Sequence, residues 1–185
     1  MHGIVLTSFR HFVTSRFGRE RAARLWANEP QYLITEAYPD DAFTDLFAKV
    51  CEETGSNAEE LLRAFGAFAA QRTFVLLYPS YFELAGDART FMLTVENRIH
   101  ELVRATVPDA QPPRLHVAPL GEDGVRIRYD SKRRLCILLD GLIRGTAEHF
   151  EEDADVSEVE CMLRGDPACV FDVRLTAGAA LDGQA

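Results

Sequence analysis

The sequence predicts an α+β fold, in which a helical N-terminal part precedes a smaller part built from a short antiparallel sheet and helices. Apolar residues recur at helical spacing through about the first hundred residues of the chain. After Pro108 the pattern changes, and residues 125–130 alternate with a period of two, as half-buried strands do. Pro112 and Pro113 lie at this change and favour extended backbone in the residue before each of them.

The first half is expected to contain five helices, each with a recognisable start or stop. Gly18 and Gly55 are typical of helix C-termini. Asn57, with Glu60 three residues later, resembles a capping box, and Asp87 is a second N-cap candidate. The expected helices run from about Val5 to Phe17, from Ala22 to Trp26, from Asp40 to Gly55, from Asn57 to about Leu77 before Pro79, and from Asp87 to Val107.

The second half is expected to contain four strands and one helix. A tight turn at residues 121–124 joins the first two strands, and the sequence Arg164-Gly165-Asp166-Pro167 joins the last two. The acidic run from Glu148 to Asp155 is predicted to be a solvated loop, with a docking surface as the alternative. The expected strands are Leu115–Leu120, Val125–Asp130, Val156–Leu163 and Cys169–Leu175, with a helix from about Arg134 to Phe150 before the third.

Composition limits the possible classes of function. The 185 residues are 47% hydrophobic, which is enough for one well-cored domain. The formal net charge of −9 argues against a nucleic-acid partner. No apolar run approaches the roughly 18–20 residues that span a bilayer, and the N-terminus lacks the pattern of a secretory signal. We therefore expect a soluble, cytoplasmic protein without a membrane partner, whose four cysteines are thiols or metal ligands.

Polar groups follow the core along one face of the strand that begins at Val125. With a period of two, this face carries Val125, Ile127, Tyr129, Ser131 and Arg133. A buried phenol and hydroxyl need partners, and a guanidinium group binds a carboxylate or phosphate with two parallel bonds. The strand therefore predicts an anion clamp at the edge of an apolar pocket. The alternative is an ordinary strand that leaves the core, with Ser131 and Arg133 in water.

A histidine lies on an apolar helix face. His100 shares this face with Leu93, Val103 and Val107. Such a residue is commonly a core imidazole with one satisfied nitrogen, but a neutral imidazole is also what a buried iron or zinc requires. The histidine, the clamp and the many aromatic residues together match a flat apolar macrocycle with two carboxylates and an axial metal. Haem has these properties, with His100 as the axial ligand and the clamp on the propionates.

Six short motifs follow one another along the chain: Met1-x-Gly3, Phe82-Glu83-Leu84, His100, Pro112-Pro113-Arg114-Leu115, Tyr129-x-Ser131-x-Arg133 and Gly141-Leu142-Ile143-x-Gly145. In this order they resemble the haem nitric oxide/oxygen-binding (H-NOX) family, which is related to the sensor domain of soluble guanylate cyclase. The resemblance implies that His100 is the proximal iron ligand. It implies that Tyr129, Ser131 and Arg133 hold the propionates. Pro113 would press on the macrocycle and distort it.

The resemblance also implies a domain plan. Residues 1–176 would form a single haem-binding domain, with a b-type haem between two parts. The distal part, about residues 1–65, would be helical, and the proximal part, about residues 66–176, would be α/β. Residues 177–185 are expected to form a flexible tail.

One departure from the family bears on the choice of gas. Oxygen-binding members place a tyrosine above the iron, and the matching position here is Leu138. Phe9 stands where those members tend to have a tryptophan. Phe9 and Val5 are both expected to contact the haem. Bound O₂ needs a hydrogen-bond donor to stay, whereas nitric oxide does not. The resemblance therefore implies binding of NO and CO and exclusion of O₂.

Three cysteines form a second candidate metal site. Cys161 and Cys169 are equidistant from Gly165, so a hairpin there would bring them together. Cys136, at the start of the helix after the clamp strand, is the third cysteine. Some bacterial members of the family bind a structural zinc with a histidine and cysteines at positions similar to these three. The matching histidine position here is Glu158, and a carboxylate is a poorer partner beside thiolates. Free thiols are the alternative.

The favoured function is a haem-based gas sensor that is not an enzyme. In the family, NO breaks the iron–histidine bond and the change is passed to a partner, often a histidine kinase or a cyclic-di-GMP enzyme. One alternative is a haem enzyme or a 4-vinyl-reductase-like ligand-binding domain, suggested by Cys161-x7-Cys169-x-Phe171. Another is a relative that binds a hydrophobic small molecule without haem.

Overall fold

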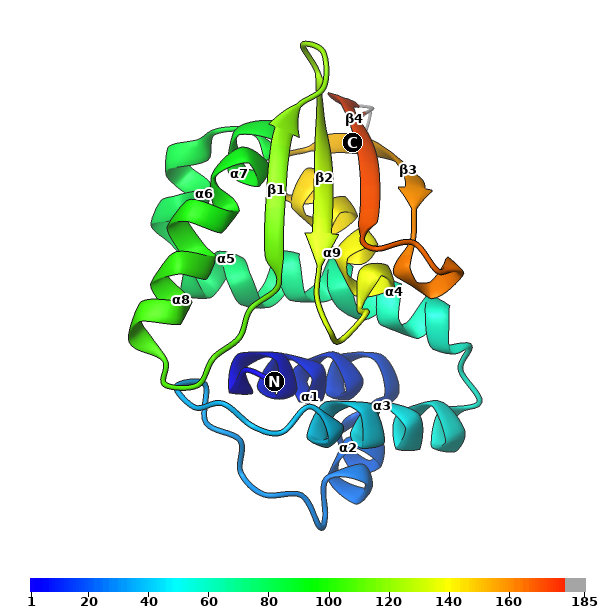
Figure 1. Cartoon of the computed structure of the whole chain (residues 1–185). Helices are drawn as coiled ribbons and strands as arrows, with labels where there is room; N and C mark the ends of the chain where they lie inside the picture. Colours follow the sequence, from blue (N-terminus) through cyan, green and yellow to red (C-terminus); the bar gives the residue numbers. More distant parts are fainter. Residues whose placement is uncertain (179–185) are drawn as a thin grey trace, which may run out of the picture.

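The computed structural model describes residues 1–178 and confirms the predicted mixture of helices with a small antiparallel sheet. Figure 1 shows three helices at one end of the molecule and the sheet at the other, with further helices beside and behind the sheet. The helices at the first end are α1 (Gly3–Phe17), α2 (Arg19–Leu25) and α3 (Asp41–Thr54). These three agree closely with the predicted ranges.

Two long helical runs follow, and each contains a π-helical turn. The first consists of α4 (Ala58–Ala69), η1 (Ala70–Phe74) and α5 (Val75–Leu77). The second consists of α7 (Ala88–Val95), η2 (Glu96–His100) and α8 (Glu101–Thr106). Both predicted caps are confirmed, because the side chain of Asn57 accepts a hydrogen bond from the Glu60 amide at 3.1 Å, and that of Asp87 accepts one from the Thr90 amide at 2.6 Å.

Between these runs lies a short helix that the sequence analysis missed. It is α6 (Pro79–Ala85), and it begins at the proline that was expected only to end the preceding helix. Proline lacks an amide proton and has a fixed φ, so it is well tolerated in the first turn of a helix. Phe82 of α6 is buried and stacks on Phe91 of α7 with ring centroids 4.0 Å apart. This packing stabilises a helix too short to stand alone.

The sheet contains four antiparallel strands in the order β1-β2-β4-β3. Side chains of β2 alternate as predicted, with Val125, Ile127 and Tyr129 buried and Arg126 and Arg128 exposed. Figure 1 shows α9 behind the sheet and α6 to α8 beside β1. The elements of this part are β1 (Arg114–Pro119), β2 (Gly124–Asp130), α9 (Cys136–His149), β3 (Glu152–Glu160), the 3₁₀ turn η3 (Met162–Arg164) and β4 (Cys169–Ala177).

The third strand was predicted in the wrong place. Instead of Val156–Leu163 it runs from Glu152 to Glu160, so part of the acidic run forms an edge strand rather than a solvated loop. Ala154 and Val156 pair with Leu175 and Val173 of β4, while Asp153 and Asp155, which alternate with them, are exposed. An edge strand accepts charges on its solvent side, and these charges hid the alternation. The flexible tail was expected at residues 177–185, but Ala177 belongs to β4. Residues 179–185 of that predicted tail lie outside the described residues.

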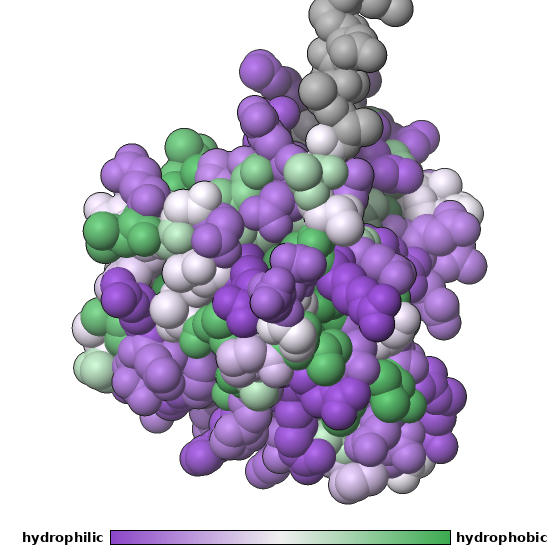
Figure 2. All heavy atoms as spheres, turned by 90° about the horizontal axis from the view of Figure 1, so that it is seen from above, coloured by the Kyte–Doolittle hydropathy of each residue, from purple (hydrophilic) through white to green (hydrophobic). Residues whose placement is uncertain are grey.

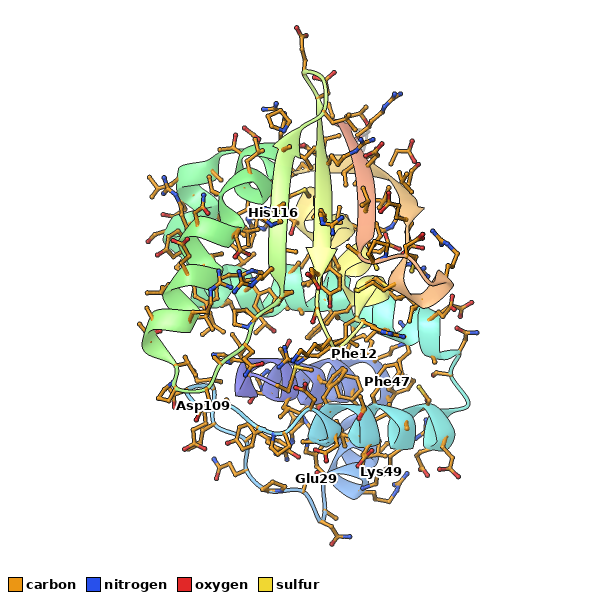
Figure 3. All side chains as sticks on the ribbon, viewed as in Figure 1. Phe12, Glu29, Phe47, Lys49, Asp109 and His116 are labelled. Atoms are coloured by element: carbon orange, nitrogen blue, oxygen red, sulfur yellow. The ribbon has the colours of Figure 1, made fainter. Side chains whose placement is uncertain are left out.

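The apolar interior contains an aromatic cluster among α1, α3 and α4. Phe9 and Phe65 meet edge to face with centroids 5.0 Å apart, and Phe9 also packs on Phe43 at 5.4 Å. Phe12 and Phe47 belong to the same cluster. Figure 3 shows Phe12 on the side of α1 that faces α4, where its ring lies 5.5 Å from that of Phe68. A second cluster lies between the sheet, α7 and α9. The expected boundary between the two parts near residue 65 stays a prediction.

Helices α4 and α9 pack closely and connect the two clusters. A Cβ atom added to Gly141 of α9 would lie 2.1 Å from the carbonyl oxygen of Arg63, and one added to Gly66 would lie 2.4 Å from that of Leu138. A Cβ atom added to Gly145 would lie 2.5 Å from the carbonyl oxygen of Ala67. The glycines of the Gly141-to-Gly145 motif therefore allow the two backbones to touch.

The face in Figure 2 is largely hydrophilic, with apolar residues interspersed. Within residues 1–178, no helix has both the length and the apolar character required to cross a bilayer.

Candidate functional site

A cavity of about 230 Å³ is lined by residues from both parts of the fold. Helices α1, α4 and α9 contribute to its wall, together with the helical run that contains η2. The strands β1 and β2, the loop after α8 and the loop after β2 complete it. Most of the lining residues are apolar. The polar exceptions include His100, Tyr129, Ser131 and Arg133, so the structure brings the histidine and the clamp of the sequence analysis to one cavity.

His100 is held in place by an acidic residue one turn earlier. It lies in the π-helical turn η2, and its Nδ1 atom is 2.8 Å from Oε2 of Glu96. The same oxygen of Glu96 accepts a hydrogen bond from the backbone amide of Leu115 at 3.1 Å, and the other oxygen is paired with Arg104. The carboxylate therefore joins this helical run to β1 while it orients the imidazole.

The imidazole of His100 is set up to act as a metal ligand. Burial lowers its pKa below the usual 6.5, and the opposing effect of Glu96 does not cancel this. The ring is therefore neutral near pH 7. Because Nδ1 donates to Glu96, the lone pair of Nε2 is left for the cavity. Burial alone would raise the pKa of Glu96, but the hydrogen bonds from His100, Arg104 and Leu115 outweigh it and lower this pKa.

The residues of the Tyr129-x-Ser131-x-Arg133 motif lie where β2 runs into the next loop. The Tyr129 side chain is buried, and its hydroxyl accepts a hydrogen bond from the Leu135 amide at 3.2 Å. Burial raises the pKa of Tyr129, so the phenol stays neutral. The Ser131 hydroxyl accepts a hydrogen bond from the Arg133 amide at 3.3 Å. These bonds fix the backbone that presents the guanidinium group.

Arg133 connects the two parts of the molecule. Its Nε atom donates to Oδ1 of Asp40 at 2.7 Å, and Nη1 donates to the carbonyl oxygen of Gln111. The side chain is 17% exposed, and it also lines the cavity. Asp40 accepts a second ionic bond, from the amino group of Met1 at 2.7 Å. Arg133 thus carries a donor-rich group at the rim of an apolar cavity, where a carboxylate ligand could be bound.

The remaining predicted site residues divide into two groups. Pro113, Leu138 and Val5 all line the cavity. Phe9 does not contribute to its lining, and is instead completely buried in the aromatic cluster, with its ring 5.9 Å from that of Trp26.

Two residues of the site were missed by the sequence analysis: Glu96, which holds His100, and Ser8, which lines the cavity. Glu96 could have been found, since it precedes His100 by four residues and so shares its helix face. Ser8 also lines the cavity, bonded to Thr73. Nothing in the sequence pattern brings these two hydroxyls together, because they lie 65 residues apart on different helices.

The structure brings the three cysteines of the second candidate metal site close together. The sulfur atoms of Cys136 and Cys161 are 3.7 Å apart, and those of Cys161 and Cys169 are 3.9 Å apart. One oxygen of Glu158 joins them, and the four atoms all lie within 4.8 Å of one another. Glu158 is also paired with Arg164 at 2.6 Å. Burial raises the pKa of Cys136 and that of Cys169, so both sulfurs are protonated thiols unless a cation binds.

The sequence matches a family model and one curated protein. The model of the haem-NO-binding (HNOB) family matches residues 2–158. Soluble guanylate cyclase 89Db of Drosophila melanogaster is 23% identical over 143 residues, which cover 72% of this chain and 20% of that protein. The chain thus spans about a fifth of the length of this curated relative.

Solved structures extend the likeness over the whole fold. An H-NOX protein from S. oneidensis in the Fe(II)NO state has a TM-score of 0.87 at 21% identity, covering 95% of this chain and 99% of that one. An unliganded Fe(II) H-NOX protein from K. algicida has a TM-score of 0.77 at 22% identity, covering 100% of both chains. An oxygen-binding H-NOX domain related to soluble guanylate cyclases, in its oxygen complex, has a TM-score of 0.80 at 28% identity, covering 95% and 94%.

Proposed function

The chain belongs to the haem-NO-binding family, and we propose that it is a gas-sensor domain that holds one b-type haem through His100. The observation that carries the proposal is a neutral imidazole beside an apolar cavity, with Nδ1 engaged by Glu96. This leaves Nε2 as the ligand atom, which is the form that an iron ion requires. When bound, haem would supply an iron that takes up NO or CO.

The other residues of the cavity fit the same ligand. Arg133 would bind a propionate in two parallel bonds, and Tyr129 and Ser131 would support it. Pro113 and the aliphatic residues of β1, β2 and α9 would cover the apolar macrocycle. Since Arg133 also bonds to Asp40, it would connect the cofactor to the segment before α3.

The proposed ligand choice depends on Leu138. This residue lines the cavity where oxygen-binding relatives have a tyrosine, and its side chain cannot donate a hydrogen bond. Bound O₂ carries partial negative charge and gains most from a donor, so we propose NO and CO as ligands and exclusion of O₂.

The proposed signal is the release of His100 from the iron. His100 belongs to the run from α7 to α8, and Glu96 of the same run bonds to the Leu115 amide of β1. A freed His100 would let this run move relative to the part that holds Arg133. Only such a difference between states can be passed to a partner. The partner proposed is a histidine kinase or a cyclic-di-GMP enzyme, so the chain itself would be a sensor rather than a catalyst.

An absorption spectrum tests haem binding and its ligand. Wild-type protein reconstituted with haem should show a five-coordinate ferrous spectrum. His100→Gly should lose it, and added imidazole should restore it, since the free ring can occupy the vacated space. His116→Gly is the matched control, because His116 is exposed on β1 (Figure 3). A His100→Gly protein with the wild-type spectrum, without imidazole, would refute the assignment.

The proposed release can be tested without knowing the partner. Haem-loaded His100→Gly without imidazole should resemble the NO-bound wild type in the amide NMR shifts of α7, η2 and α8. If these shifts instead match the unligated wild type, loss of the His100 bond is not the trigger.

We further propose a structural zinc ion at Cys136, Cys161 and Cys169, with Glu158 or a water molecule as fourth ligand. The compact set of four ligand atoms supports it. Glu158→His should tighten zinc binding, because imidazole is a better partner than a carboxylate beside thiolates, and Glu160→His is the control on the same strand. Protein purified without chelators should contain one zinc per chain by elemental analysis. Absence of zinc from both the wild type and Glu158→His would leave the cluster as free thiols.

A further inference from the structure

One hydroxyl group that lines the cavity is hydrogen-bonded to a second hydroxyl on another helix. Ser8 lies on α1, is completely buried and lines the cavity. Its Oγ atom is 2.7 Å from Oγ1 of Thr73, which lies on η1. The helix neighbours of Ser8 that also face the cavity, Ile4 and Val5, are aliphatic. The serine is therefore a polar point on an otherwise apolar stretch of α1.

Helical hydroxyls usually donate to a carbonyl oxygen one turn earlier in their own helix. Thr14 does so to Arg10 at 2.7 Å, and Thr106 does so to Leu102 at 2.8 Å. The Ser8 hydroxyl instead bonds across to a second hydroxyl, and it has no bond to its own helix among the described residues.

The two hydroxyls together have two protons, and only one of them is used in the bond between them. When Thr73 donates to Ser8, the proton of Ser8 remains free for another acceptor. When Ser8 donates to Thr73, its lone pairs face the cavity instead. An acceptor inside the cavity favours the first arrangement, which costs the protein no hydrogen bond.

The backbone of η1 brings Thr73 to this position. The π-helical turn interrupts the run from α4 to α5, and Phe74, the next residue, lines the cavity. Such turns carry an unfavourable geometry and are frequent at functional sites. The second π-helical turn, η2, carries His100. Both interruptions in the long helical runs thus place residues at this cavity.

From this geometry we infer that Ser8 is the hydrogen-bond donor that α1 presents to a gas ligand, and that Thr73 is the residue that positions it. The inference rests on the proposed function, and it names a residue that controls how long a ligand stays. Leu138 supplies no donor, so the shared hydroxyl of Ser8 is the donor that α1 offers to the ligand. A shared donor of this kind holds a polar diatomic more weakly than a phenol dedicated to it.

The carbon monoxide complex of the haem-loaded full chain provides the test. A donor to the bound ligand lowers its C–O stretching frequency, so Ser8→Ala should shift the infrared band to higher frequency. CO should also dissociate about two- to tenfold faster, as expected for the loss of one hydrogen bond. Thr73→Val should shift the band in the same direction, because an unsupported Ser8 can turn to the carbonyl of its own helix. Thr73→Ser should keep the wild-type band.

A double variant and a control complete the design. If the two hydroxyls act as a unit, Ser8→Ala/Thr73→Val should shift the band no further than Ser8→Ala does. Thr14→Val, on an exposed part of α1, should leave the band unchanged. A wild type that forms a CO complex, with an unchanged band in Ser8→Ala, overturns this inference alone. A wild type that takes up no haem overturns the proposed function and this inference with it.

Discussion

The Nδ1 atom of His100 lies 2.8 Å from a carboxylate oxygen of Glu96, one helical turn earlier. Residues four apart share a helix face, but here the π-helical turn and the Leu115 amide fix which atoms meet. The carboxylate determines which nitrogen keeps its proton, and so makes Nε2 the ligand atom. The relationship between these two residues therefore decides the chemistry that the cavity can support.

Glu96→Ala should weaken haem binding without removing the iron ligand. With Nδ1 unpaired, the ring can rotate and its basicity falls, and loss of such a supporting partner typically costs about 10–100-fold in metal affinity. Haem transfer to apomyoglobin measures the effect. Glu101→Gln, an exposed acid in the same run, is the control. An unchanged transfer rate in Glu96→Ala would show that the carboxylate does not support the ligand.

Arg133→Ala should impair haem retention more than ligand binding. A charge-assisted hydrogen bond contributes roughly 1.5–3 kcal/mol, so haem should dissociate about one to two decades more readily. Lys132→Ala serves as the control, because the neighbouring side chain is exposed. The clamp assignment fails if Arg133→Ala retains haem as tightly as the wild type.

The ion pair between Asp40 and Arg133 should make stability depend on acid pH. Burial alone would raise the pKa of Asp40, but the bonds from the amino group of Met1 and from Arg133 lower it below the usual 3.8. A lowered folded-state pKa stabilises the protein above pH 3.8, and this stabilisation is lost as the pH falls from there through the folded value. The Asp40 side chain is half exposed, so solvent screens the pair and its contribution is small.

Asp40→Asn is the variant that tests this pH dependence. It should lower the free energy of unfolding by roughly 0.2–1 kcal/mol at pH 7. Urea unfolding should show the difference shrinking below pH 3.8. A difference that stays constant between pH 7 and pH 3 would mean that ionisation of Asp40 does not contribute.

Leu138→Tyr should create a stable oxygen complex. The wild-type ferrous protein should keep its unligated Soret band in air until it slowly oxidises, because Leu138 offers no proton and the shared hydroxyl of Ser8 holds O₂ more weakly than a dedicated phenol would. A tyrosine hydroxyl at this position would supply the donor that bound O₂ needs. Leu138→Phe adds the ring without the hydroxyl and is the matched control. A persistent oxy spectrum in the wild type would contradict the proposed selectivity.

Gly141→Ala should destabilise the packing of α4 on α9. The added Cβ atom would lie 2.1 Å from the Arg63 carbonyl oxygen, so the helices must separate. Overpacking of this kind costs about 1–3 kcal/mol, even though alanine is the better helix former. Chemical denaturation measures the loss. A variant as stable as the wild type would mean that the interface yields easily at this point.

Several elements were predictable because their signals are local. The caps at Asn57 and Asp87, the alternation of β2 and the glycine that ends α3 each depend on neighbours a few residues away. Strand β3 was misplaced because its charged outer residues hide the inward pattern, and α6 was missed because Pro79 can either end or begin a helix. In both cases packing against distant residues settled the outcome.

The sequence by itself determined the fold class, the family resemblance, and the residue types needed for a metal ligand and an anion clamp. The fold class and the residue types follow from periodicity and spacing along the chain. The family resemblance follows from the order of six short motifs. The tertiary structure alone decided that Arg133 bonds to Asp40, that Phe9 packs in the core and that Ser8 meets Thr73. Arg133 and Asp40 are 93 positions apart in the sequence, and Ser8 and Thr73 are 65 positions apart. Their geometry depends on how whole helices pack, and no local pattern records it.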